Sequence, residues 1–180
     1  MTEYYSGHTF MEVRNRLMLM TFFDTGIRVS ELINLKLSQV KDEYILIHGK
    51  GDKERVVPKS PLLNKWMFKY LSTRENFFAY RRVPENVFLS RNGRPMTTEA
   101  IHRVIKIAGK AVGVSKDIRV SPHTCRHTFA QMQLKNGLDL YSLSRLMGHS
   151  NISITQRYLE GLRDFEVLNA CKATGILMNL

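Results

Sequence analysis

The apolar positions of the chain recur mainly with the period of three to four residues that is typical of amphipathic helices. Val13, Leu17 and Met20 share one stripe of a predicted helix from about Phe10 to Asp24, which Thr25-Gly26 ends. Ser60-Pro61 and Ser121-Pro122 each join an N-cap residue to a proline at the first helical position. The same signals predict helices over residues 29–35, 98–111, 122–135 and 139–147, one that opens at residue 61, and one that Ser150 or Asn151 caps and that carries Tyr158.

Short β-rich runs interrupt this helical pattern. Tyr44–His48 and Arg55–Val57 flank a glycine-containing basic segment, residues 49–53, and therefore predict a hairpin with a basic tip. Val87–Leu89 predicts a further short strand. No repeat or linker divides the chain. We therefore expect one domain over residues 1–180 of the α+β class, mainly α-helical with a small antiparallel β-sheet.

The chain is strongly basic, and its charge is concentrated. It has 180 residues with 27 Lys and Arg against 16 Asp and Glu, which gives a formal net charge of +11. Between Arg91 and Arg126, eight basic residues accompany two acidic ones, so this stretch alone carries +6. Such clustering favours a surface that tracks phosphates, and the alternative is a solvated basic helix face. A partner of opposite charge is expected.

Several classes of protein are disfavoured. No apolar run approaches the roughly 18 residues of a membrane span. The first residues lack the features of a signal peptide, so a cytoplasmic location is expected. Cys125 and Cys171 make neither a disulfide framework nor a zinc cage. The chain also lacks a Walker A motif and an acidic metal cluster, so we expect no metal and no cofactor.

Three segments stand in a characteristic order. Asp24–Leu32 contains Thr25-Gly26-Ile27-Arg28, Ser121–Ala130 contains His123 and Arg126 three residues apart, and Leu146–Tyr158 contains Gly148-His149. A His-x-x-Arg pair is weak evidence by itself, but the three segments together resemble the catalytic domain of the tyrosine recombinases, the phage-integrase family. The resemblance extends from about residue 10 to Glu160. It implies the fold of the DNA breaking-rejoining enzymes.

The resemblance assigns an arginine clamp. Arg28 and Arg126 match the family's two catalytic arginines, which would hold the non-bridging oxygens of a scissile DNA phosphate and stabilise the charge of the transition state. Glu31, one turn after Arg28, matches an acidic residue that supports the site, and the alternative for Glu31 is an exposed helix carboxylate.

The resemblance also assigns the groups that move protons. Lys50 matches the hairpin lysine that protonates the departing 5′ oxygen as general acid, with Lys53 as the competing candidate. His123 would act in proton transfer near the nucleophile, and His149 would hydrogen-bond a phosphate oxygen. Tyr158 follows His149 by nine residues, the family's interval to the nucleophile. Cations or a base must help to remove its proton, because a tyrosine hydroxyl has a reference pKa of about 10.

The implied reaction is site-specific DNA recombination or integration. Tyr158 would form a 3′-phosphotyrosyl link without a metal, and two rounds of strand exchange would pass through a Holliday junction. The implied partners are double-stranded DNA, further copies of the chain and an accessory DNA-bending protein, with a tetramer on two duplexes when active and a monomer when free. The basic residues expected to contact DNA are Lys53, Arg55, Arg91, Arg94, Arg103 and Lys106.

Alternatives remain open at this level. A DNA-binding regulator could keep the scaffold without cleaving, a type IB topoisomerase shares the chemistry without partner exchange, and a metal-dependent nuclease would lose activity in chelator. Relatives carry an N-terminal helical DNA-binding domain, but here 27 residues precede Arg28. The chain is therefore expected to be an isolated catalytic domain or a small recombinase that lacks that domain. The tail, residues 161–180, is expected to contact a neighbouring subunit or its own domain.

Overall fold

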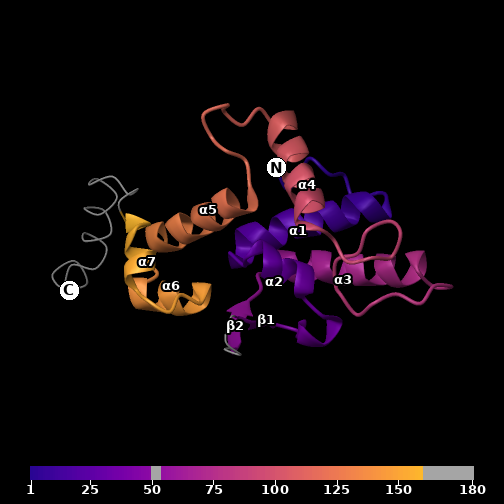
Figure 1. Ribbon diagram of the computed structural model, residues 1–180, viewed down its shortest axis with the longest axis horizontal. Coiled ribbons are helices and arrows are strands. Elements are labelled where there is room, and N and C mark those ends of the chain that lie inside the picture. Colours follow the sequence, from indigo (N-terminus) through magenta and orange to yellow (C-terminus); the bar gives the residue numbers. More distant parts are fainter. Residues whose placement is uncertain (50–53, 160–180) are drawn as a thin grey trace.

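The structure is a computed structural model that describes residues 1–49 and 54–159. Lys50, Lys53 and the tail of residues 161–180 lie outside the described residues. The elements follow one another as shown in Figure 1: α1 (Phe10–Thr25), α2 (Val29–Asn34), a 3-10 helix η1 (Leu37–Gln39), β1 (Tyr44–His48), β2 (Glu54–Pro58), α3 (Pro61–Phe77), α4 (Thr98–Ala111), α5 (Pro122–Lys135), α6 (Leu140–Met147) and α7 (Ser153–Gln156). The predicted α+β class with a small antiparallel sheet is confirmed.

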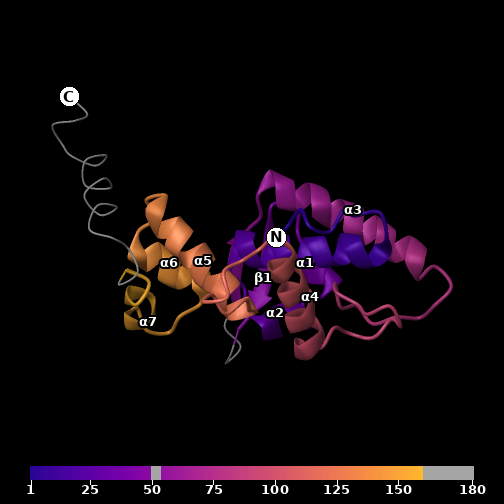
Figure 2. The same ribbon diagram turned by 90° about the horizontal axis from the view of Figure 1, so that it is seen from above.

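Helix α1 forms the centre of the larger hydrophobic core. Leu17, Leu19 and Phe22 are fully buried, so α1 is covered on several sides, and α3 lies beside it in both views (Figures 1 and 2). Thr9 caps its start, and Glu12 completes the capping box. These caps and the burial fix the orientation of the C-terminal end of α1, from which the next segment leads into the candidate site.

The hairpin has the predicted boundaries within one residue. Strands β1 and β2 pair antiparallel, with Ile47 opposite Arg55 and His48 opposite Glu54. Ile45, Ile47 and Val57 are buried and attach one face of the hairpin to the core. Arg55 lies on the same face as Val57, because residues two apart in a strand point to the same side, and its side chain is only 10% exposed.

Two details of the predicted elements are wrong. Val87–Leu89 is buried but forms no regular strand, because its backbone bonds are shared among different neighbours: Val87 N–H donates to Leu35 O and Met96 N–H to Phe88 O. Helix α7 ends at Gln156, so Tyr158 lies in the turn that follows it. The N–H of Tyr158 donates to Thr155 O, a tighter turn than that of an α-helix.

A second, smaller core lies at one end of the molecule. Helices α6 and α7 gather there beside α5, away from α3, as both views show (Figures 1 and 2). Its buried residues are Phe129, Ala130, Leu143, Met147 and Tyr158. Helix α5 begins at Ser121-Pro122 as predicted, packs against α1 and extends into this end of the molecule. The candidate site lies where the two cores meet.

None of the helices within residues 1–49 and 54–159 has the length and hydropathy that crossing a bilayer requires.

Candidate active site

Arg28 is placed by the turn between α1 and α2. Gly26 adopts the left-handed conformation, with φ of 59°, and the chain then enters α2 with Arg28 as its N-cap residue. Glu31 folds back over this start: its Oε2 accepts the backbone N–H of Arg28 at 2.7 Å, and its Oε1 accepts Nη1 of Arg28 at 2.9 Å. The side chain of Arg28 is 40% exposed. The turn therefore presents a fixed guanidinium at the surface of the site.

Glu31 is a buried carboxylate with two arginine partners. Its side chain is 6% exposed, and Arg55 donates Nη1 and Nη2 to its two oxygens, each at 2.8 Å. Burial alone would raise the pKa of Glu31, but the hydrogen bonds from Arg55 and from the Arg28 backbone outweigh burial and lower it to about 2. The structure thus favours the supporting carboxylate over the alternative of an exposed one.

Three arginines meet at the C-terminal end of α6. Helix ends leave backbone carbonyls without helical partners, and cations are favourable there. Here each of the three last carbonyls accepts from a different guanidinium. The pairs are Arg55 Nε with Leu146 O at 2.9 Å, Arg126 Nη2 with Met147 O at 2.7 Å, and Arg28 Nη2 with Gly148 O at 3.1 Å. Arg126 also donates Nη1 to Gly26 O at 2.5 Å and so ties the two site segments together.

The electrostatics of Arg126 follow from this crowding. Burial and the nearby charge of Arg28 lower the pKa of Arg126 to about 10. The guanidinium therefore stays protonated near neutral pH. Arg28 and Arg126 thus lie together at the site, and both face the loop after α6.

His149 is held between Arg126 and Thr155. Nη2 of Arg126 lies 3.1 Å from Nε2 of His149, and Oγ1 of Thr155 lies 2.8 Å from Nδ1. A guanidinium only donates, so Nε2 is the acceptor and the neutral ring carries its proton on Nδ1, which donates to Thr155. Burial, followed by the charges of Arg126, Arg28 and Arg55, lowers the pKa of His149 to about 4. The imidazole is therefore neutral at pH 7.

Tyr158 reaches the same group of residues from the turn after α7. Its side chain is buried, at 8% exposure, and its ring lies parallel to that of His149, with 6.2 Å between centroids and 11° between planes. The centroid of the His127 ring, on α5, lies 5.1 Å from that of Tyr158. His123 is exposed one turn earlier on α5. Burial, followed by the nearby His123, lowers the pKa of His127.

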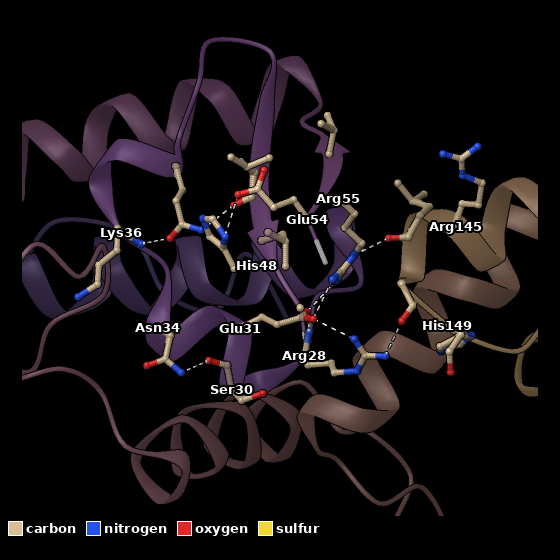
Figure 3. Close-up of a pocket in the computed structure, with 18 of the residues that line it drawn as sticks. Arg28, Ser30, Glu31, Asn34, Lys36, His48, Glu54, Arg55, Arg145 and His149 are labelled. Carbon is tan, nitrogen blue, oxygen red and sulfur yellow. Dashed lines mark hydrogen bonds and ion pairs between the residues drawn. The ribbon is translucent and has the colours of Figure 1, made fainter. Parts of the chain in front are cut away.

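The site opens onto a groove between the hairpin and α6. Figure 3 shows Arg28 and Arg55 pointing toward Glu31 at its floor and His149 beside the end of α6, with Arg145 on the α6 wall and His48 on the hairpin wall. Four Lys or Arg residues and two Glu residues line the described part of the groove, which therefore has a net positive charge. Neutral imidazole, fixed guanidinium groups and a nearby tyrosine hydroxyl are the groups that metal-free phosphoryl transfer needs.

Arg55 lines the groove and His123 is exposed on α5, and the other predicted site residues fall into three groups. Arg28, Glu31, Arg126, His149 and Tyr158 are brought together. The general-acid candidates Lys50 and Lys53 lie outside the described residues. The remaining predicted DNA contacts, Arg91, Arg94, Arg103 and Lys106, are exposed in or before α4 and do not line the groove.

Arg103 and Lys106 line a separate shallow hollow on α4 with His102. Thr155 was not expected as the partner of His149, nor Arg55 as the partner of Glu31. The pair of Arg55 with Glu31 joins distant segments and so leaves no local signal in the sequence. Among the residues that the structure describes, no group of three or more His, Cys, Asp or Glu could hold a metal ion.

Comparison with solved structures defines the class of fold. The crystal structure of XerA recombinase superimposes with a TM-score of 0.79 at 31% identity, covering 92% of this chain and 59% of that one. XerH site-specific recombinase bound to palindromic difH substrate, in a post-cleavage complex, superimposes with a TM-score of 0.76 at 24% identity, covering 93% of this chain and 47% of that one. The fold is that of the tyrosine recombinase catalytic domain.

Sequence comparison agrees with the fold. Residues 5–163 match the model of the phage integrase family, and the chain belongs to that family. It is 40% identical over 147 residues to tyrosine recombinase XerD of Staphylococcus aureus, which covers 81% of this chain and 49% of the relative. XerD of Lacticaseibacillus casei is 40% identical over 148 residues, covering 81% of this chain and 50% of the relative. The chain thus spans about half the length of these curated relatives.

Proposed function

We propose that this chain is the catalytic part of a site-specific DNA recombinase that cleaves with Tyr158. The convergence of Arg28, Arg126, His149 and Tyr158 on one loop after α6 carries the proposal. These side chains come from three segments far apart in the sequence, so their meeting depends on the fold. The similarity to proteins named XerD and XerA, both recombinases, supports the same reaction.

The chemistry of the proposal is an in-line transfer at phosphorus. Oη of Tyr158 attacks the scissile phosphate and gives up its proton, with His123 assisting that transfer. The bond from phosphorus to the 5′ oxygen breaks, and Lys50, or Lys53 as the competing candidate, protonates that oxygen. A 3′-phosphotyrosyl link and a free 5′-hydroxyl result. The reverse attack by a hydroxyl from a partner duplex restores the backbone and, over two rounds, passes through a Holliday junction.

The guanidinium groups of Arg28 and Arg126 would neutralise the phosphate oxygens as charge gathers on them. His149 would hydrogen-bond one of these oxygens. The phosphate must then replace Arg126 or Thr155, because Nε2 of His149 accepts from Arg126 and Nδ1 donates to Thr155 in the structure.

DNA would extend from the groove over further basic surface. Arg91, Arg94, Arg103 and Lys106 are exposed and are proposed to contact backbone phosphates, with Lys53 at the hairpin tip. The proposed assembly is a tetramer of this chain on two duplexes that forms from monomers, with an accessory DNA-bending protein as a further partner.

A covalent-trapping experiment tests the proposal. The substrate is a duplex with the candidate recombination site and a nick beside the scissile phosphate. After cleavage the short strand that bears the free 5′-hydroxyl dissociates, so the covalent complex accumulates. We expect an adduct in chelator for the wild type and for Tyr80→Phe, a fully exposed control tyrosine, and none for Tyr158→Phe. An adduct that persists in Tyr158→Phe would refute the assignment of the nucleophile. Loss of activity in chelator would point to a metal-dependent nuclease.

A further inference from the structure

We propose that Arg55 is a positioning residue that holds the loop carrying His149 in place, and that it does not serve as a phosphate ligand. The inference rests on the proposed function. It replaces the role of a DNA contact, which the charge of Arg55 alone had led us to expect. It concerns the one arginine of the groove floor that comes from the hairpin.

The guanidinium of Arg55 is engaged within the protein. Each of its three nitrogens donates to a protein oxygen: Nη1 and Nη2 to Glu31 at 2.8 Å, and Nε to Leu146 O at 2.9 Å. The side chain is 10% exposed, against 40% for Arg28, which shares the carboxylate of Glu31. A bidentate pair with a carboxylate fixes the plane of a guanidinium. Arg55 is thus oriented toward the protein.

Arg55 also packs against the glycine that turns the chain out of α6. Gly148 has φ of 65°, a left-handed conformation that costs other residues energy. A Cβ at Gly148 would lie 3.0 Å from Cδ and Nη1 of Arg55 and 3.2 Å from Cζ. The side chain therefore lies directly against the backbone that precedes His149. Contact and hydrogen bond together fix where this loop begins.

These contacts make Arg55 a link between three elements. It belongs to β2, its carboxylate partner Glu31 belongs to α2, and its carbonyl partner Leu146 belongs to α6, as the dashed lines in Figure 3 show. If this link is lost, the hydrogen bonds of Arg28 and Arg126 remain to hold the end of α6 against the rest of the site. The orientation of His149 between Arg126 and Thr155 loosens without the contribution of Arg55.

Two substitutions of Arg55 separate the two roles. Arg55→Lys keeps the charge but cannot span Glu31 and Leu146 with a planar fork, and Arg55→Gln removes the charge as well. Arg82→Lys and Arg82→Gln are the matched controls, because Arg82 is exposed in the loop after α3. The dissociation constant for a nicked duplex is measured over a series of salt concentrations, and cleavage is measured in single turnovers at saturating DNA.

For a positioning residue, we expect Arg55→Lys to bind DNA within about twofold of wild type with an unchanged salt slope, and to cleave at least tenfold more slowly. Both Arg82 variants should cleave like wild type. A phosphate ligand would behave differently: Arg55→Gln would lower the salt slope by about one, and saturating DNA would restore cleavage. That second result would overturn the proposal.

A measurement on the free protein keeps this test independent of the proposed function. Long-range proton–nitrogen spectra report the tautomer of His149, and we expect the Nδ1–H form in wild type and a mixture of forms in Arg55→Lys. Gly148→Ala, whose added Cβ would crowd Cδ and Nη1 of Arg55, should give the same mixture if the Arg55 variants do not fold. An unchanged tautomer in every folded variant would contradict the inference, even if no protein cleaves DNA.

Discussion

The buried carboxylate of Glu31 should make the stability of the domain depend on acid in a defined window. Replacing Glu31 with glutamine removes a negative charge that Arg28 and Arg55 share. The pKa of Glu31 falls from 4.5 to about 2 on folding, a shift of roughly 2.5 units, and each unit corresponds to about 1.4 kcal/mol. Ionised Glu31 therefore contributes about 3 kcal/mol to the free energy of unfolding.

The direction of the effect follows from the lowered pKa. Because the folded-state value lies below the unfolded one, the contribution is complete above pH 4.5 and is lost as the pH falls from 4.5 toward 2. We therefore expect Glu31→Gln to be less stable than wild type by about 3 kcal/mol at pH 7. The difference should shrink through this window and disappear near pH 2.

Urea unfolding followed by circular dichroism, at half-unit intervals between pH 2 and pH 7, measures this difference. Glu75→Gln is the matched control, because Glu75 is an exposed carboxylate on α3, and its difference from wild type should stay within about 0.5 kcal/mol. A Glu31→Gln difference that stays constant between pH 5 and pH 2 would show that the loss comes from packing. A difference below about 1 kcal/mol at pH 7 would show that Arg28 and Arg55 do not stabilise the ionised form as the geometry indicates.

Three further predictions concern the site. Gly26→Ala should lower the free energy of unfolding by at least about 2 kcal/mol in urea titrations, because Gly26 has φ of 59° and a Cβ would clash with the ring of Phe129; a smaller loss would mean that the ring moves aside. The imidazole of His149 should titrate near pH 4 by NMR, and the domain should lose stability as the pH falls from 6.5 toward 4, because the unfolded chain binds a proton there that the folded ring does not; a midpoint near 6.5 would contradict this. Thr155→Val should lower the free energy of unfolding by about 1 kcal/mol, because Nδ1–H of His149 loses its acceptor, while the proton stays on Nδ1 because Arg126 still donates to Nε2; a move of the proton to Nε2, which long-range proton–nitrogen spectra detect, would contradict the assigned hydrogen bonds.

The parts of the fold that local chemistry specifies were accessible from the sequence. Ser121-Pro122 correctly marks the start of α5, and Asp139 and Gly148 correctly bound α6, because caps and a left-handed glycine act within one turn of the chain. The strand expected at Val87–Leu89 is wrong for a related reason. Its composition indicates a buried extended segment, but a strand also needs one continuous partner, which only the tertiary fold supplies.

The same division applies to the site. The order of the motifs identified Arg28, Arg126, His149 and Tyr158, and the fold brings them together. Arg55 shows where sequence reasoning ends, because a basic residue beside a basic hairpin tip gives no sign that its charge is paired. That pairing depends on Glu31 and on α6, 24 positions before and 91 positions after Arg55.

The arrangement at the end of α6 explains why the site is both strongly basic and ordered. Arg28, Arg55 and Arg126 repel one another, and the carboxylate of Glu31 together with three helix-terminal carbonyls offsets that repulsion. Burial, and the fourth positive charge that protonation of His149 would add here, lower its pKa, and the neutral ring accepts from Arg126. Under the proposed mechanism, a scissile phosphate brings the negative charge that this cluster lacks. Binding of the phosphate and the proton affinity of His149 are then thermodynamically linked, so an anion at the arginines raises the basicity of the imidazole beside Tyr158.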